Sequence, residues 1–424
     1  MSAFTDSLRL LHTRRFGIFC VASLLSNLGT WAQGVAEPWL LLSLGASSFL
    51  IGLDSFAMAA PVWILTLLGG MLADLADRRR IIATCQSIQM LCPTLLVILL
   101  LTGTIAPWMI IALSLVVGVT DALSMPSFQT IVPSIVEREQ IASALALNAT
   151  QFNLSRILGP AIAGILMAGL GAVGCFALNA ASYLPFIWVA LWILPHGRPK
   201  AAAEDGPLDR RRLLAGIRAI ARTPHLRGAL LTVLLTSTLC APITVFCPVL
   251  VKEALGGDVG VFSAAMGAFG VGGLLGAVVL LGVDAARDRR SMSSGFAAAY
   301  GLVLVLAALS PRFWELVVLL ALAGLAMAVS NISANALLQA TTLRRLRGRT
   351  VSLYMLALRG GVSIGSLLTG LSVHFLGVRQ ALLINGIVAI AAQLAVGRRW
   401  LQAPLPAFPR PAAPLDQPEA HQRP

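Results

Sequence analysis

Apolar segments of about twenty residues follow one another along the whole chain, separated by short stretches rich in turn residues or charge. A helix needs about 20 mainly apolar residues to cross a hydrocarbon core about 30 Å thick. The pattern therefore predicts twelve membrane-spanning helices, at residues 16–44, 49–73, 81–103, 106–130, 143–169, 172–194, 228–252, 259–282, 293–310, 313–340, 350–375 and 378–397. The longest polar interruption divides them into six and six.

This division predicts an all-α membrane protein of two six-helix bundles, related by a pseudo-two-fold axis along the membrane normal. The N-terminal bundle is expected at residues 1–194 and the C-terminal bundle at 228–400. Between them, 195–227 is expected to be a cytoplasmic linker with a short amphipathic helix. Residues 401–424 are expected to be a disordered cytoplasmic tail, because they are rich in proline and lack apolar periodicity.

Two short patterns support an internal duplication. The fifth predicted helix has an arginine followed by two glycines five residues apart, and so has the eleventh. The acidic and basic residues at 74–80, after the second helix, are echoed at 284–290, after the eighth. Small residues let helices approach closely, so the fifth and eleventh helices are expected to pack through Gly159, Pro160, Gly164, Gly365 and Gly370.

Composition agrees with a membrane protein. Hydrophobic residues make up 57% of the chain and charged residues 12%, about half the charged fraction of ordinary soluble proteins. The net charge of +13 does not indicate nucleic-acid binding, because the basic residues lie in short clusters between apolar segments. Of the 31 Lys and Arg residues, 26 fall in the termini and alternate loops and three in the other loops. The positive-inside rule then places both termini in the cytoplasm of a bacterial inner membrane.

Several kinds of chemistry are excluded or disfavoured. Neither lysine, Lys200 or Lys252, stands in the context of a Walker A loop, so no ATP hydrolysis is expected within this chain. The six cysteines lie in apolar segments without a Cys-x-x-Cys pair, so no metal or redox cofactor is expected. No Ser/His/Asp, His/Glu or paired-carboxylate constellation is apparent, which disfavours an enzyme.

The segment GGMLADLADRRR, residues 69–80, resembles the loop signature of the major facilitator superfamily, Gly-x3-Asp-(Arg/Lys)-x-Gly-(Arg/Lys)-(Arg/Lys). Gly70, Asp74, Arg78 and Arg79 match it, whereas a leucine and an aspartate replace the first base and the second glycine. The aspartate is common in the enterobactin-exporter-like branch, the transmembrane secretion effectors. That branch is also resembled by residues 26–44, 132–148 and 347–361, so the likeness covers nearly the whole chain.

The resemblance implies secondary transport by alternating access, with two bundles rocking about a central cavity. It also implies that the loop signature is a gating latch. Asp74 would face the start of the eleventh helix, near Arg347 and Arg349. Arg78 or Arg79 would hold an acidic partner on the fourth helix, and Asp121 lies at the matching level.

Glu37 is the first candidate for a proton-binding carboxylate, because an ionisable residue inside a membrane span is a functional candidate by default. An alternative is that Glu37 caps the outer end of its helix before Pro38 or faces a water-filled vestibule. Asp54 lies near the outer edge of the second span and is expected to be solvated. The arginine that many proton antiporters carry on the fourth helix is missing, with Leu113 and Ser114 in its place, so the coupling ion stays open.

Arg156 and Arg359 are both expected near the bilayer midplane. They either bind an anionic group of the substrate or neutralise buried acids such as Glu37, and the second reading is slightly favoured because buried charges need partners. Other polar and aromatic side chains either line a cavity or bond between helices: Trp31, Gln33, Gln151, Asn153, Asn331 and Asn335.

These features favour a monomeric exporter of small amphipathic molecules, drug-like or siderophore-like, driven by proton antiport. An uptake symporter, a lysolipid flippase and a non-transporting sensor of the same fold remain as alternatives.

Overall fold

The structure is a computed structural model that describes residues 10–137, 140–194, 223–281, 289–342, 350 and 353–402. Every regular element within these residues is helical. Most of the expected linker and nearly all of the expected tail lie outside them, so the amphipathic helix and the disordered tail are not tested.

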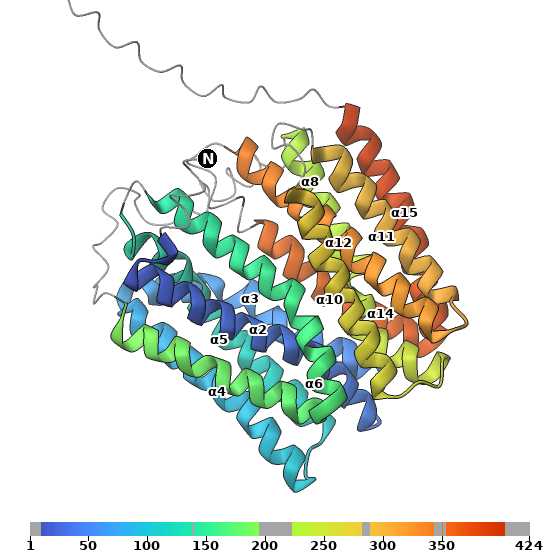
Figure 1. The fold of residues 1–424 in the computed structure, drawn as a ribbon, viewed down its shortest axis with the longest axis horizontal. Helices are drawn as coiled ribbons and strands as arrows, with labels where there is room; N and C mark the ends of the chain where they lie inside the picture. The colour runs from blue at the N-terminus through green and yellow to red at the C-terminus, as the bar shows by residue number, and fades with distance from the viewer. Residues whose placement is uncertain are drawn as a thin grey trace, which may run out of the picture.

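The N-terminal bundle consists of α2 (Arg14–Ser43), α3 (Ser48–Leu75), α4 (Arg78–Thr102), α5 (Pro107–Ser134) and α6 (Ile141–Trp192). The C-terminal bundle begins with a helix broken by two π-turns: α8 (Pro224–Leu235), η2 (Thr236–Cys240), α9 (Pro242–Val249) and η3 (Leu250–Ala254). It continues with α10 (Val259–Leu281), α11 (Arg289–Leu309), α12 (Phe313–Thr341), η5 (Leu356–Gly360) with α14 (Gly361–Leu376), and α15 (Val378–Gln402). Figure 1 shows the first bundle in blue to green and the second in yellow-green to red.

The predicted spans all correspond to helices. Ten helices of the described chain are long and apolar enough to cross a membrane, and α3 contributes the shorter apolar stretch 48–62. The long helix α6 contains two spans, because the chain turns back at Gly171, whose φ of 65° and ψ of −161° interrupt the helix. With α6 counted twice and α3 added, the helices account for all twelve expected spans. The seventh span begins at Pro224, slightly before the expected residue 228.

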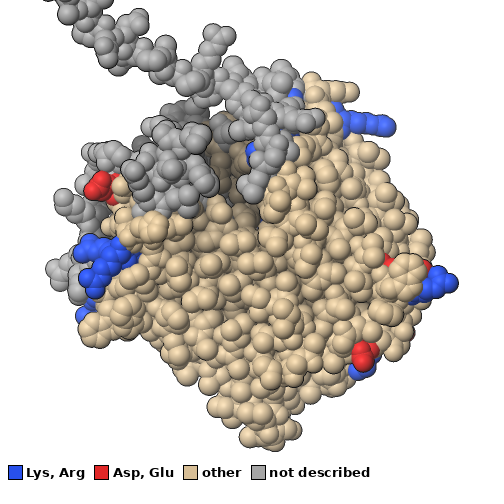
Figure 2. Space-filling view, in the orientation of Figure 1, with Lys and Arg blue, Asp and Glu red and all other residues tan. Residues whose placement is uncertain are grey.

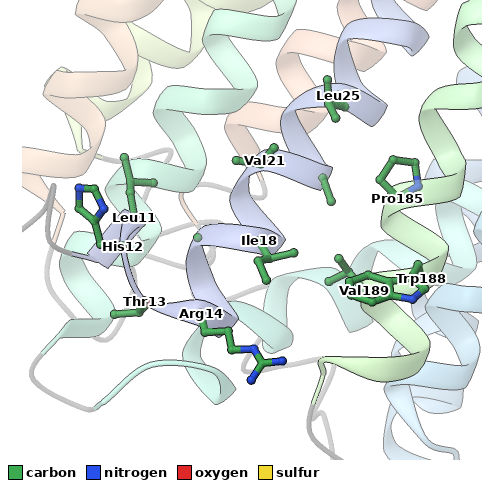
Figure 3. A pocket seen from close by; sticks show the side chains of 12 residues that line it. Leu11, His12, Thr13, Arg14, Ile18, Val21, Leu25, Pro185, Trp188 and Val189 are labelled. Carbon is green, nitrogen blue, oxygen red and sulfur yellow. The ribbon is translucent and has the colours of Figure 1, made fainter.

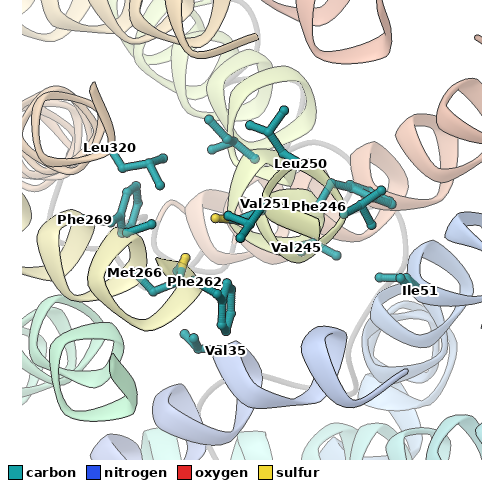
Figure 4. Packing of buried hydrophobic residues seen from close by; sticks show 14 of the residues in the cluster. Val35, Ile51, Val245, Phe246, Leu250, Val251, Phe262, Met266, Phe269 and Leu320 are labelled. Carbon is teal, nitrogen blue, oxygen red and sulfur yellow. The ribbon is translucent and has the colours of Figure 1, made fainter. Parts of the chain in front are cut away.

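Three buried apolar cores show how the bundles meet. One core draws residues from both bundles and lies where α2 ends and α10 begins (Figure 4). The other two cores each belong to a single bundle and lie at the opposite helix ends, one around Phe16 and Ile82, the other around Leu226 and Trp400. We call this second end the arginine-rich end, because α4 begins there with three arginines. In the described residues the bundles therefore share a core at one end, whereas each has a core of its own at the arginine-rich end.

Glycines form the seam between the bundles. A Cβ on Gly164 of α6 would stand 2.6 Å from the Ser263 carbonyl oxygen of α10. A Cβ on Gly370 of α14 would stand 2.7 Å from the Ser48 carbonyl oxygen of α3. These two contacts are equivalent by the duplication, since Gly164 and Gly370 are 206 residues apart. Both seams depend on helix backbones in direct contact.

A second glycine pair holds helices together within each bundle. Gly159 packs on Trp31 of α2, where a Cβ would stand 2.3 Å from the Trp31 Cβ. Gly365 packs on η2, where a Cβ would stand only 2.0 Å from the Thr238 carbonyl oxygen. These two glycines are also 206 residues apart, so each half repeats the same arrangement of one contact within its bundle and one contact across the seam.

The outer surface fits a bilayer. On the face in Figure 2, charged side chains lie towards the two ends of the helices and the broad surface between them is uncharged. Elsewhere on the molecule, large apolar side chains such as Ile64, Leu101 and Phe375 are more than 70% exposed. A groove of about 540 Å³ lies between the start of α2 and the end of α6. Arg14 lies at one end of the groove, and apolar side chains line the rest of it (Figure 3).

Candidate functional site

Glu37 lies inside the N-terminal bundle. Its side chain is 4% exposed, and the Ser114 hydroxyl of α5 donates a hydrogen bond of 2.8 Å to Glu37 Oε1. Pro38 stands inside α2, which continues to Ser43. Glu37 therefore does not cap a helix end, and the alternative reading as a cap is wrong.

Asp54 is a second buried acid beside Glu37, not the solvated residue that the sequence suggested. It is 5% exposed, its Oδ1 has no hydrogen-bond partner, and its carboxyl group also interacts with Ser114. Neither acid forms an ion pair with another described residue. Ser114, which stands where an arginine was expected, thus joins two carboxyl groups from α2 and α3.

A signal for this pair was present in the sequence. Glu37 lies six residues before the end of α2, and Asp54 lies six residues after the start of α3. Because the two helices are antiparallel neighbours joined by a short turn, equal counts place both acids about 9 Å below the same membrane surface. Counting from the shared turn would have paired them.

Amides and hydroxyls surround the acids. Gln33 accepts a hydrogen bond of 2.7 Å from Asn179 on the second half of α6. Gln33, Asn179 and Glu37 line a small cavity together with Gln89 of α4. The cavity has about 10 Å³ of room for the centre of a water molecule, which is about the minimum for one bound water. Glu37 and Gln89 therefore line one cavity with room for about one water.

Asp121 connects this network to the other bundle. Its Oδ1 accepts a hydrogen bond of 2.9 Å from Gln89, and its Oδ2 lies 2.9 Å from Nη1 of Arg359. The Arg359 guanidinium also lies 6.0 Å from the ring centroid of Phe152 on α6. The side chains of Arg359 and Asp121 are 37% and 32% exposed although both lie in the middle of helices. Solvent therefore reaches the space between the bundles at this level.

The expected partners of Asp121 were different. Arg78 donates to the Ala73 carbonyl oxygen at 3.3 Å and Arg79 to the Leu191 carbonyl oxygen at 2.9 Å, so both arginines hold helix ends within their own bundle. Asp77, the residue that departs from the superfamily signature, accepts a hydrogen bond from the Arg79 amide and caps α4. The assignment of Asp121 as partner of Arg78 or Arg79 is corrected to a pair with Arg359.

The rest of the expected latch is only partly described. The side chain of Asp74, and Arg347 and Arg349, lie outside the described part of the structure. A Cβ on Gly70 would meet nothing within 4 Å, whereas a Cβ on the neighbouring Gly69 would stand 2.5 Å from the Ala122 carbonyl oxygen of α5. The close approach of α3 to α5 thus depends on Gly69.

Arg156 has no acidic partner among the described residues. It is 5% exposed, and its Nε and Nη2 have no hydrogen-bond partner. Tyr354 of the C-terminal bundle lies beside the guanidinium but outside hydrogen-bonding geometry, and its hydroxyl is also unpartnered. Arg359 does pair with an acid, Asp121, but that acid is only partly buried, and neither arginine pairs with Glu37.

Among the remaining cavity candidates, several are bonded within their own bundle. Gln151 donates to the Ser23 hydroxyl at 3.0 Å. Asn335 accepts from Gln339, one turn further along α12. Trp31 packs edge to face on Phe152 with ring centroids 6.1 Å apart. Asn331 is buried, and its Oδ1 has no hydrogen-bond partner. Asn153 is partly exposed and interacts with another residue.

This polar network lies inside the N-terminal bundle and reaches the C-terminal bundle through the pair of Asp121 with Arg359. Comparison with known protein families gives a match to the model of the transmembrane secretion effectors over residues 5–419. The chain belongs to this family of the major facilitator superfamily. It is therefore a multi-pass membrane protein of a transporter family and not an enzyme.

Curated relatives of this transmembrane secretion effector differ in the cargo that their names state. A staphyloferrin A transporter of Staphylococcus aureus is 26% identical over 88% of this chain and 93% of its own length. The multidrug efflux pump Tap of Mycolicibacterium fortuitum is 25% identical, covering 87% of this chain and 93% of the pump. An enterobactin exporter of Shigella boydii is 27% identical, covering 94% and 96%.

Solved structures confirm the major facilitator fold. The nucleoside transporter NupG matches with a TM-score of 0.69 and 13% identity, over 92% of this chain and 99% of that chain. A bacterial homologue of the lysosomal transporter Spinster matches with a TM-score of 0.63 and 16% identity, over 92% and 98%. At these identities the likeness concerns the fold alone.

Proposed function

We propose that this protein exports small amphipathic molecules by alternating access and that inward movement of protons drives the export. The observation that carries the proposal is the pair of buried acids, Glu37 and Asp54, joined by Ser114. The names of three relatives, a siderophore transporter, a multidrug efflux pump and an enterobactin exporter, support the direction and the class of substrate.

The acid pair is suited to bind a proton. Two negative charges close together in a medium of low dielectric repel strongly, and neither carboxyl group has a basic partner among the described residues. One shared proton removes one charge and lets one carboxyl group donate a hydrogen bond. Such a pair takes up a proton when it is buried and releases it when the helices move and water reaches it.

Asp121 supplies a route from the pair to the space between the bundles. Gln89 bonds Asp121 and lines the same one-water cavity as Glu37. The cavity and Gln89 thus link the acid pair to a carboxyl group that solvent reaches. We infer that Asp121 is the station through which protons pass at the arginine-rich end, and that its pair with Arg359 changes when the bundles rock.

The sidedness follows from the basic residues. The 26 Lys and Arg residues of the termini and alternate loops assign the arginine-rich end to the cytoplasm, so the core that the bundles share lies towards the outside. We assign both termini to the cytoplasm of a bacterial inner membrane. A single chain contains both bundles and the site between them, so a monomer suffices for this function.

Everted membrane vesicles provide the test. Substrate uptake that collapses when a protonophore is added, and is unaffected by removal of sodium, is expected. Uptake insensitive to both treatments would overturn proton coupling. Accumulation only in right-side-out vesicles would show uptake instead of export, and specific movement of lysolipid between leaflets would show a flippase. A growth screen of a deletion strain against toxins and under iron limitation would select the substrates to be tested.

A further inference from the structure

Arg156 has an unusual position for a charged side chain. It lies on α6 immediately before Ile157, whose carbonyl oxygen and side chain pack against Gly270 and Gly273 of α10. Arg156 thus lies at the edge of the seam between the bundles, on the side towards the arginine-rich end. A buried charge without a partner is strongly unfavourable, and buried polar groups are almost always hydrogen-bonded.

The identity of the unpartnered nitrogens defines a ligand geometry. Nε and Nη2 are the two nitrogens that lack partners, and they lie on one edge of the guanidinium group. Their N–H bonds point in parallel, at the spacing that matches the two oxygens of a carboxylate. The free edge of Arg156 is therefore a fork for a planar anion with two oxygen acceptors.

Two hydroxyl groups of the C-terminal bundle extend this donor set. Tyr354 Oη lies beside the guanidinium, and Tyr300 of α11 is close enough to interact with its charge. Neither hydroxyl has a hydrogen-bond partner, and both tyrosines are buried. Unsatisfied donors from both bundles, Arg156 and Tyr354, thus lie beside each other, and no described acid is paired with Arg156.

The other intramembrane arginine serves as an internal comparison. Arg359 lies on the equivalent helix of the second half, and Asp121 neutralises it. Among the described residues, a carboxylate therefore pairs with Arg359 and none pairs with Arg156. Since an unpaired buried cation is costly, its retention at the seam points to a partner that comes from outside the chain.

We propose that Arg156 binds a carboxylate group of the transported molecule, with Tyr354 as a further donor. The proposal rests on the proposed transport function and narrows its substrate class to amphipathic molecules that carry a carboxylic acid. Because the site joins α6 of one bundle to Tyr354 of the other, a bound carboxylate would link the two bundles during the transport cycle.

Equilibrium binding without a proton gradient tests the proposal independently of the coupling mechanism. The probes are a fluorescent xanthene dye with a free carboxylic acid and the methyl ester of the same dye, added to the purified full-length protein in detergent. Bonds to a charged group are stronger than those between neutral groups. The wild type is expected to bind the acid at least about tenfold more tightly than the ester, since a factor of ten corresponds to about 1.4 kcal/mol.

Three variants isolate the fork. R156Q is expected to abolish the preference for the acid by weakening acid binding and leaving ester binding unchanged. R156K keeps the positive charge but loses the two parallel N–H donors, so it is expected to show only part of the preference for the acid over the ester. R312Q is the matched control, because Arg312 is exposed and pairs with Glu315 at a helix end. It is expected to behave as the wild type.

Thermal unfolding separates a binding role from a structural role. Replacement of an unpaired buried charge by glutamine is expected to leave the melting temperature unchanged or to raise it. Addition of the acid dye is expected to stabilise the wild type most, R156K less and R156Q least. The proposal is overturned if the wild type does not prefer the acid, if it binds neither dye, if R156Q retains the preference, or if R156Q alone lowers the melting temperature. Failure of protonophore sensitivity in vesicles would leave these binding results unaffected.

Discussion

Arg359 of the C-terminal bundle and Asp121 of the N-terminal bundle form an ion pair across the space between the bundles, with Nη1 2.9 Å from Oδ2. Both partners are about one third exposed, so the pair is partly screened by solvent. Exposed pairs contribute about 0.2–1 kcal/mol, and this one belongs in that range. An energy of this size is suited to bias an equilibrium between two conformations without locking it.

Substitution of either partner should therefore shift the protein away from the arrangement described here. D121N and R359Q are each expected to increase the population open at the shared core by up to about fivefold. The reporter is S366C in a background without the six native cysteines, because Ser366 is buried in the seam against Gly52. Labelling by a membrane-impermeant maleimide added from the outside should rise in both variants.

The double variant D121N/R359Q supplies the control. If the two residues act through their pair, the combined effect should be smaller than the sum of the single effects. Strictly additive effects, or labelling unchanged in both single variants, would count against a gating role for the pair.

Loss of the acid at Glu37 should uncouple transport. E37Q cannot release a proton, so uphill accumulation in everted vesicles is expected to fall to the level of a protonophore-treated control, while exchange of substrate down its gradient continues. D54N retains Glu37 and its bond from Ser114, so a smaller loss is expected. Release of protons upon substrate addition, measured in weakly buffered detergent solution, should disappear in E37Q. Uphill transport by E37Q at the wild-type rate would end the candidacy of Glu37.

The seam glycines should control conformation more than stability. In G164A and G370A, the new methyl groups would stand 2.6 Å and 2.7 Å from backbone oxygens of the opposite bundle. The bundles can relieve this clash by separating, so S366C labelling is expected to rise strongly in both variants. G295A is the matched control, since a Cβ there meets nothing within 4 Å. If G164A and G370A are labelled like G295A, the seam between the bundles does not open and close during the transport cycle.

The glycine contact within the C-terminal bundle should behave differently. A Cβ on Gly365 would stand 2.0 Å from the Thr238 carbonyl oxygen of η2, inside a single bundle that cannot separate. G365A is therefore expected to destabilise the fold by about 1–3 kcal/mol, as overpacking usually does. A melting temperature equal to that of the wild type would contradict this. G295A, where a Cβ also meets nothing within 4 Å, should be neutral or slightly stabilising.

Gly171 should resist replacement for a backbone reason. Its φ of 65° and ψ of −161° fall in a region that is almost restricted to glycine, although a Cβ there would meet no other atom within 4 Å. G171A is therefore expected to cost about 1–3 kcal/mol through strain alone. The measurement is the midpoint of unfolding compared with G169A, which has equally open surroundings but an ordinary backbone. Equal midpoints would contradict the strain.

Depth along a helix could be predicted from the sequence, but rotation about the helix axis could not. Counting apolar residues located the spans, and counting from the turn after α2 would have placed Glu37 and Asp54 at one level. Whether Asp54 faces lipid, water or Glu37 depends on how α3 is rotated against α5, and this is set by close contacts such as that of Gly69 with Ala122. The partner of Asp121 was missed for the same reason: Arg78 shares its bundle, whereas Arg359 reaches it from the π-turn η5, which no periodicity indicates.

The glycine pairs and the arginine pair follow different spacings. Corresponding glycines are 206 residues apart, whereas Arg156 and Arg359 are 203 apart, so the arginines differ by about one helical turn in position. At the glycine spacing, Arg359 corresponds to Asn153 and Arg156 to Val362. The symmetry of the backbone is therefore not a symmetry of charge. Because the two-fold axis runs along the membrane normal, it relates the two bundles at equal depth, and the displaced arginine therefore gives the two facing walls of the central space different charges at the same depth.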